Sequence, residues 1–250
     1  MGFILAAGVP DASARWLPKP TTAAWQWQLT TPVDTSVPAP VYEIDGWEND
    51  ASVVADLHAK GRKVICYMVA GSYEPFRPDA GSFPPEVLGR PLDGFEDERW
   101  LDIRRIDLLR PIIEARFRQC KEKGFDAIEA DNVDGFENRT GFPLTPADQL
   151  RYNRFLADLA HGMDISIALK NDTAQVRKLV RKFDMAVVEQ CFEFDECEAY
   201  SPFIRAKKAV FIAEYRRRPK RFCADARDLR MSAIFKRLDL DAFRLTCPRR

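Results

Sequence analysis

The chain has 250 residues, of which 46% are hydrophobic and 30% are charged, as is typical of a globular protein with a sizeable core. Lysine plus arginine number 38 and aspartate plus glutamate number 38, so the formal net charge is +0. Without a basic field, the composition disfavours a general nucleic-acid binder, and no apolar run approaches the about 18 residues of a membrane span. There are only two histidines, His58 and His161, which disfavours a Ser-His-Asp triad or a multi-histidine metal site. A catalyst here must rely mainly on carboxylates, lysine or tyrosine.

We divide the chain into an N-terminal segment, 1–22, and one domain, 23–250. The sequence MGFILAAGVPDASA has a short apolar run and small residues before Arg15, but it lacks a basic start and a full apolar stretch. We interpret it at most as the remnant of a signal region.

The six cysteines form an even set without a CxxC pair, so zinc-ribbon spacing is absent. Free buried thiols are one interpretation, and disulfides formed in an oxidising compartment are the other. We expect Cys191 and Cys197 to close a short loop, with Cys223–Cys247 and Cys66–Cys120 as the remaining pairs. This predicts a secreted or cell-surface protein.

In chain order, the sequence repeats a short β-rich run, polar residues and an amphipathic helix that ends near glycine. The predicted strands are 25–29, 41–44, 64–69, 125–130, 165–169, 185–188, 209–213 and 232–235. Helices are expected near 51–60, from about Leu109, after Thr145 with Pro146 in the first helical position, and around 176–180. Pro111 would be tolerated only in the first turn of its helix.

Eight strands that mostly alternate with helices predict an α/β fold of the closed (β/α)8 TIM-barrel type, in a single domain. Its first connection is irregular and proline-rich, and a long loop through Gly94 follows the third strand. An open doubly wound sheet is the alternative, but no glycine-rich phosphate-binding motif follows any strand. We expect a monomer without cofactor or metal.

In such barrels the active site lies at the carboxyl ends of the strands. The residues predicted there are Asp45, Asp131, Lys170, Glu189, Glu214 and Lys236, followed closely by Asn132, Asp134, Asn171 and Asp172. Any one of them is equally typical of a solvated loop or a helix cap. A pair of carboxyl groups at strand ends, however, is what cleavage of a glycosidic bond requires. One acts as nucleophile or stabiliser, and the other acts as proton donor.

Several motifs carry a closer resemblance: KGFDAIEADNVDG, ALKND, VVEQCFEFDEC and AVFIAEY, with the earlier WQWQL, VICYMVAGSYE and RWLDIR. In this order and spacing, from Trp25 to Pro248, the chain resembles glycoside hydrolase family 114, which contains endo-α-1,4-polygalactosaminidases with a TIM-barrel fold. The resemblance implies that Asp131 and Glu189 are the catalytic carboxylates. By analogy with other barrel glycosidases, we expect Asp131 to be the nucleophile and Glu189 the acid/base. The family commonly has proline before the motif aspartate, where this chain has Ala130.

Further strand-end residues are expected to bind the sugar. Asp45 and Glu214 would contact hydroxyl or amino groups, or else pair with Lys170 and Lys236, which would tune the carboxylate pKa values. The other predicted substrate contacts are Trp27, Tyr67, Asn132, Asp134 and Asn171. Trp25 and Trp27 alternate with Gln26 and Gln28, and core packing is the default for at least one of these tryptophans.

The expected partner is a cationic amino-sugar polysaccharide, because galactosamine units carry a protonated amine near neutral pH. An acidic rim on a neutral body would attract such a polymer. Its members would be Asp45, Asp131, Asp134, Asp172, Glu189, Glu193, Asp195, Glu196 and Glu214. Two alternatives stay open: a non-catalytic barrel that binds amino-sugar polymer, and a lysine-dependent lyase or aldolase that uses Lys170 or Lys236.

Overall fold

A curled sheet of nine strands forms the centre of the computed structural model, which describes residues 15–248. Eight strands are parallel and lie side by side in chain order: β1 (Gln26–Gln28), β2 (Val41–Asp45), β3 (Lys63–Val69), β7 (Ala127–Asp131), β8 (Ser166–Lys170), β9 (Met185–Glu189), β10 (Val210–Glu214) and β11 (Ser232–Phe235). The short β12 (Leu245–Thr246) pairs antiparallel with β11. All eight predicted strands are therefore present, while the first 14 residues of the expected signal remnant lie outside the described part of the chain.

The strands are buried on both faces, as parallel strands covered by helices require. In β7, Ala127 belongs to a cluster inside the curled sheet, whereas Ile128 and Ala130 belong to the cluster between sheet and helices. This alternation also turns Glu129 and Asp131 toward the inside, because successive side chains of a strand point to opposite faces. The inner cluster includes Trp25 and Trp27, whose rings stack with centroids 5.6 Å apart.

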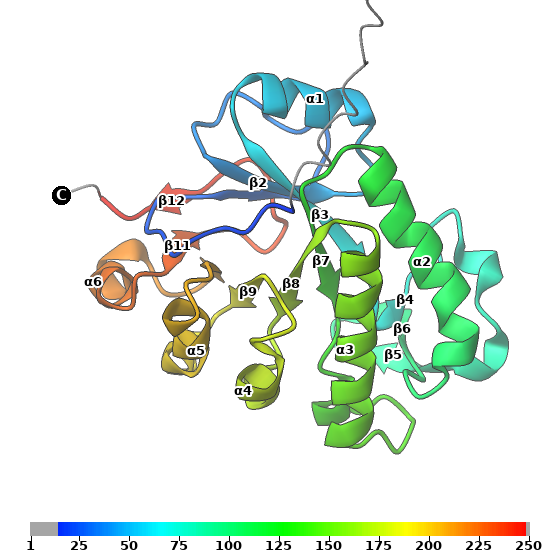
Figure 1. Ribbon diagram of the computed structural model, residues 1–250. Helices are drawn as coiled ribbons and strands as arrows, with labels where there is room; N and C mark the ends of the chain where they lie inside the picture. The colour runs from blue at the N-terminus through cyan, green and yellow to red at the C-terminus, as the bar shows by residue number, and fades with distance from the viewer. Residues whose placement is uncertain (1–14, 249–250) are drawn as a thin grey trace, which may run out of the picture.

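Helices surround the sheet, as Figure 1 shows. They are α1 (Ala51–Ala59), α2 (Ile106–Glu122), α3 (Pro146–Gly162), α4 (Val176–Leu179), α5 (Ser201–Arg205) and α6 (Cys223–Asp228). At the start of α3, Thr145 and Asp148 form a reciprocal capping box with Pro146 in the first position, which confirms the predicted helix start.

The expectation for Pro111 was wrong. Helix α2 begins at Ile106 instead of near Leu109, so Pro111 lies beyond its first turn. Proline there removes one hydrogen bond at a cost of about 3 kcal/mol. Burial of the apolar face outweighs this cost, with Leu109, Ile113 and Phe117 fully buried.

The long loop predicted after the third strand contains a second, antiparallel sheet. Its strands are β4 (Ser72–Tyr73), β5 (Leu88–Leu92) and β6 (Phe95–Leu101), in the order β4-β6-β5. Arg116 of α2 fixes this segment, because it donates to Val69 O at 2.7 Å and pairs with Asp79 at 2.7 Å. The sheet lies beside α2 in Figure 1 and carries the β5–β6 hairpin toward the strand ends.

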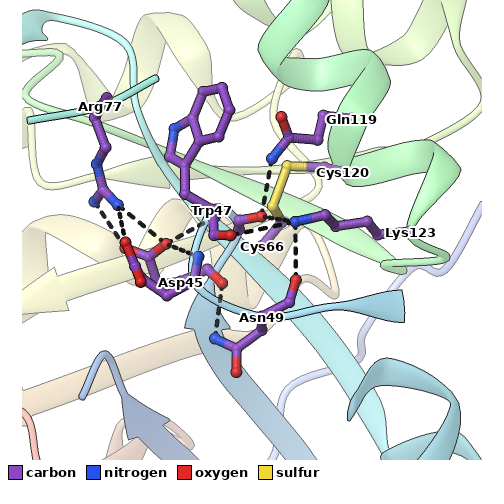
Figure 2. Close-up of a disulfide and its surroundings, with 10 residues drawn as sticks. Asp45, Trp47, Asn49, Cys66, Arg77, Gln119, Cys120 and Lys123 are labelled. Atoms are coloured by element: carbon purple, nitrogen blue, oxygen red, sulfur yellow. Dashed lines mark hydrogen bonds and ion pairs between the residues drawn. A yellow bond between two sulfur atoms is a disulfide. The ribbon is translucent and has the colours of Figure 1, made fainter. Parts of the chain in front are cut away.

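Three disulfides join the cysteines in the expected pairs, Cys191–Cys197, Cys223–Cys247 and Cys66–Cys120. Figure 2 shows that Cys66–Cys120 ties β3 to α2. Beside it, a Cβ on Gly46 would meet Cys66 Sγ at 2.4 Å, so only glycine fits. Lys123 Nζ and Gln119 Nε2 donate to Gly46 O at 2.7 and 3.0 Å, which fixes this turn against the end of α2.

The first and last parallel strands of the sheet are β1 and β11. Within residues 15–248, no backbone hydrogen-bond ladder pairs these two strands. Other hydrogen bonds cross this seam. Leu29 N donates to Leu240 O at 2.9 Å, and Ser232 Oγ donates to Ala23 O at 2.5 Å. The structure thus shows the α/β class and a curled parallel sheet. Within residues 15–248, no helix is long and apolar enough to cross a membrane.

Candidate active site

The strands β7, β8 and β9 each end in a charged residue that is followed by a left-handed residue. Asp131, Lys170 and Glu189 end the strands, and the residues after them have φ values of 61°, 45° and 57°. Two of these left-handed residues are Asn132 and Asn171, and asparagine tolerates this conformation better than most residues. The chain therefore turns away sharply, and the three charged side chains remain together at the mouth of the curled sheet.

The buried Lys170 ammonium connects the two expected catalytic carboxylates. Its Nζ lies 2.9 Å from Asp131 Oδ1 and 3.2 Å from Glu189 Oε2, and it also lies 2.8 Å from Glu129 Oε1. Two oxygens this close to one nitrogen are no farther apart than about 6 Å. Sequence reasoning placed Asp131 and Glu189 at strand ends, and the structure brings them together on one cation.

This arrangement keeps Lys170 positively charged. Burial alone would lower its pKa, but the surrounding carboxylates of Asp131, Glu129 and Glu189 raise it well above the usual range. For Asp131, burial alone would raise the pKa, yet Lys170 and hydrogen bonds from Tyr67 and Asn132 hold it below its usual range. Asp131 is therefore ionised near neutral pH.

Two tyrosines orient the two carboxylates. The Tyr67 hydroxyl donates to Asp131 Oδ2 at 2.8 Å, and the Tyr215 hydroxyl donates to Glu189 Oε1. Burial, followed by the neighbouring carboxylate, raises the pKa of both phenols, so both stay protonated as donors. The Asn171 amide oxygen accepts from Glu189 N at 3.0 Å, and Asn132 Nδ2 donates to Ser72 Oγ at 2.7 Å. Residues on or directly after several different strands therefore hold the two carboxylates and the turns that follow them in place.

Two further carboxyl groups, Glu43 and Glu129, lie beneath Lys170 and are fully buried inside the sheet. Burial, and then the neighbouring Glu129, raises the pKa of Glu43 well above its usual range. Burial also raises the pKa of Glu129, against the attraction of Lys170. This shift favours the protonated, neutral form of Glu43. Neither residue was singled out from the sequence, although the alternation along β2 and β7 places both side chains inside.

A cavity of about 420 Å³ opens over these groups. Eight of its lining residues were expected at the site: Trp27, Tyr67, Asp131, Asn132, Asp134, Lys170, Asn171 and Glu189. The others were missed: Leu29, Phe95, Val133, Gln190, Tyr215, Leu238, Asp239 and Leu240. A larger cavity of about 930 Å³, between α2 and α3, is lined by none of the strand-end residues.

Three expected substrate contacts do not line this cavity, and each has another protein group as a hydrogen-bond or ion-pair partner. Asp45 pairs with Arg77 at 2.7 Å and accepts from Trp47 N, as Figure 2 shows. Glu214 Oε1 accepts from Phe192 N at 2.8 Å, while its Oε2 has no partner among the described residues. Lys236 Nζ donates to the carbonyls of Asp241 and Phe243 at 2.5 and 2.7 Å.

The two tryptophans of the first strand are both buried, and Trp27 also takes part in the site. Trp25 Nε1 donates to Ile212 O at 3.3 Å, so this side chain packs inside the sheet. The Trp27 ring lies 5.0 Å from Lys170 Nζ and lines the cavity. A cation over an aromatic face is attracted by its quadrupole, so Trp27 supports the ammonium.

The chain is similar to known glycoside hydrolases over nearly its whole length. The model of glycoside-hydrolase family GH114 matches residues 6–250. The chain is 36% identical to Ega3 of Aspergillus fumigatus, solved in complex with galactosamine, with a TM-score of 0.88 and coverage of 96% of this chain and 100% of that one. A search of curated proteins gives no match.

Two more distant structures share the fold. The glycoside hydrolase domain of PelA from Pseudomonas aeruginosa is 13% identical, with a TM-score of 0.69 over 92% of this chain and 100% of that one. The α-galactosidase TtGalA of Thermus thermophilus is 12% identical, with a TM-score of 0.57 over 88% of this chain and 59% of that one. The family model, which spans nearly the whole chain, and the similarity to Ega3 agree with the paired carboxylates: the chain belongs to glycoside hydrolase family GH114.

Proposed function

We propose that the chain is an endo-acting hydrolase of α-1,4-linked galactosamine polymers, with Asp131 as nucleophile and Glu189 as acid/base. The observation that carries the proposal is the pair of carboxylates held on one buried ammonium at the floor of a cavity. The galactosamine bound to Ega3, a 36% identical relative, supports the amino sugar as substrate.

The carboxylate separation favours a retaining mechanism. Retaining glycosidases hold their carboxyl groups about 5–5.5 Å apart, whereas inverting enzymes need about 6.5–9.5 Å to admit a water. The nearest oxygens of Asp131 and Glu189 lie within about 6 Å of each other. This distance lies below the inverting range and suits direct attack by Asp131.

The reaction then has two steps. The ionised Asp131 attacks the anomeric carbon while Glu189 gives its proton to the leaving glycosidic oxygen, and a glycosyl ester forms on Asp131. Glu189 next takes a proton from a water that attacks the same carbon and releases Asp131. The Glu189 side chain is 27% exposed against 14% for Asp131, which suits the residue that must meet water.

The lysine-dependent alternative finds no support in the geometry. A Schiff base needs a neutral amine, and the carboxylates around Lys170 keep it charged. Burial lowers the pKa of Lys236 to about 8, but its ammonium is held by two backbone carbonyls away from the cavity.

We also propose that the curled sheet is a TIM-type barrel whose β1–β11 seam is closed by the hydrogen bonds described above. Three disulfides are compatible with an extracellular location, and we propose that the enzyme works outside the cell, where its polymeric substrate would be found.

The test is digestion of deacetylated and acetylated α-1,4-galactosamine polymer and of amylose, with products read by mass spectrometry. We expect a ladder of internal fragments from deacetylated polymer, fewer from acetylated polymer and none from amylose. Added salt should slow the reaction, because it screens the attraction of the polycation. Release of monosaccharides alone, or equal rates on all three polymers, would contradict the proposal.

A further inference from the structure

A second cavity of about 440 Å³ adjoins the catalytic one on the side of Glu189. The two cavities share four lining residues, Asp134, Asn171, Glu189 and Gln190, whereas Asp131 lines only the first. Ligand pockets in proteins typically measure about 300–1,000 Å³. Glu189 thus stands between two compartments, each of pocket size.

The second cavity is acidic throughout. Its carboxyl groups are Asp134, Glu137, Asp172, Glu189 and Glu196, and none of its lining residues is lysine, arginine or histidine. The nearby Arg216 and Arg217 point elsewhere, because they pair with Glu193 and Asp195, which do not line the cavity.

Asp172 supplies an independent observation, a buried acceptor without a protein donor in the described part of the chain. Its side chain lines the cavity and is only 1% exposed. Oδ2 accepts from Asn153 Nδ2 at 2.8 Å, but Oδ1 has no partner among the described residues. An unpartnered buried acceptor is unfavourable, because it has lost its hydrogen bonds to water without gaining a protein donor. Burial, then the charge of Asp134, raises the pKa of Asp172 to about 8.

One wall of this cavity comes from the segment closed by the Cys191–Cys197 disulfide. Within it, Phe194 is 61% exposed and lines the cavity together with Glu196. An exposed aromatic side chain offers a flat apolar surface, while the carboxylates offer acceptors. A ring with one apolar face and a cationic substituent fits both.

We propose that this second cavity, defined by Glu137, Asp172, Phe194 and Glu196, is the leaving-group subsite and selects a sugar with a free, protonated amine. The inference rests on the proposed function, because the sugar on the far side of Glu189 is the one released when Glu189 donates its proton. Asp172 and Glu196 receive the ammonium, and charge-assisted hydrogen bonds of this kind are stronger than those to a neutral acetamide.

The experiment reads which sugar occupied the subsite. After digestion of a half-deacetylated polymer, the leaving-group sugar becomes the new non-reducing end of a fragment, so mass spectrometry of those ends reports it directly. For the unmodified protein we expect about tenfold enrichment of free-amine sugars there, which is the factor that about 1.4 kcal/mol gives. In Asp172→Asn and Glu196→Gln the enrichment should disappear. Asp195→Asn is the matched control, since it removes the same charge from the same segment outside the cavity.

A binding measurement separates this proposal from the proposed function. Calorimetry with a fully deacetylated galactosamine tetramer uses the Asp131→Asn protein, with and without Glu196→Gln. We expect about tenfold weaker binding with Glu196→Gln and none of that loss with Asp195→Asn. If the polymer is cleaved but the variants change neither the composition of the new non-reducing ends nor the affinity, the proposed subsite is wrong while the proposed function is retained. If the affinity changes but no polymer is cleaved, the cavity binds the amine as proposed, and the proposed function is wrong.

Discussion

At the residue scale, a single buried lysine organises the chemistry. Lys170 contacts Glu129, Asp131 and Glu189, which come from three different strands. Its position directly after an apolar run was sufficient to predict it as a strand-end residue. Its partnership with Glu129 was not predictable in the same way, because a carboxylate inside a strand is recognised only when the neighbouring strands show which face is enclosed.

The same limit explains the three strand-end residues that lie away from the cavity. Asp45 and Glu214 follow apolar runs just as Asp131 and Glu189 do. Asp45 pairs with Arg77, which comes from the irregular segment after β3, and one oxygen of Glu214 accepts from the backbone of Phe192. Such partners depend on tertiary contacts, and a strand pattern does not contain them.

Tyr67 offers a test of how the nucleophile is kept ionised. Its hydroxyl donates to Asp131 and so favours the charged carboxylate. Tyr67→Phe removes this donor, and the pKa of Asp131 should rise. The acid limb of kcat/KM should then move to higher pH by about one unit, since a hydrogen bond to a charged group contributes about 1.5–3 kcal/mol.

The control for this prediction is Tyr73→Phe, the same substitution at a tyrosine that does not line the cavity. Its pH profile should match that of the unmodified protein. An unchanged acid limb in Tyr67→Phe, or an equal shift in both variants, would mean that Tyr67 does not set the ionisation of Asp131.

At the element scale, the sequence pattern predicted regular units well and the irregular segment poorly. The eight strands and the capped start of α3 follow from local signals, namely short β-rich runs, a Thr145 cap and Pro146. The small sheet after β3 was missed, because Pro91 and Gly94 are typical of a loop. Its hairpin is held instead by distant contacts, such as Arg90 N to Thr140 O at 2.8 Å. Phe95 reaches the cavity through this hairpin.

The disulfide at the second cavity should affect both stability and substrate binding. Replacing Cys191 and Cys197 with serine frees a short loop, and the chain-entropy model gives a loss of about 2 kcal/mol in the free energy of unfolding. Because Phe194 and Glu196 lie on this loop, KM for deacetylated polymer should also rise. Urea unfolding and steady-state kinetics check the two effects.

The matched control replaces Cys223 and Cys247, which tie α6 to the C-terminal segment. This longer loop should cost about 3 kcal/mol of stability in the same model. KM should stay unchanged, since neither cysteine lines either cavity. A rise in KM of the same size in both double variants would show that the effect is general destabilisation and not the loss of a cavity wall.

At the scale of the whole molecule, net charge conceals how charge is arranged. The chain is formally neutral, yet the two cavities beside Glu189 gather carboxylates against one lysine. The acidic rim expected from the sequence is therefore partly present: Asp134, Asp172 and Glu196 line the cavities, whereas Asp45 and Glu214 do not. Glu137, which lies on a short turn six residues after Asp131, was overlooked because no strand ends there.

The central claim is that Asp131 and Glu189 hydrolyse galactosamine polymer with retention, and NMR of the first products tests it most directly. A time course on deacetylated α-1,4-linked oligomer should show the α-anomer first, before mutarotation, as two successive displacements at one carbon require. Asp131→Asn and Glu189→Gln should each leave less than about a tenth of the rate, which corresponds to a loss of more than about 1.4 kcal/mol. The β-anomer as first product, or either variant cleaving at close to the unmodified rate, would contradict the account.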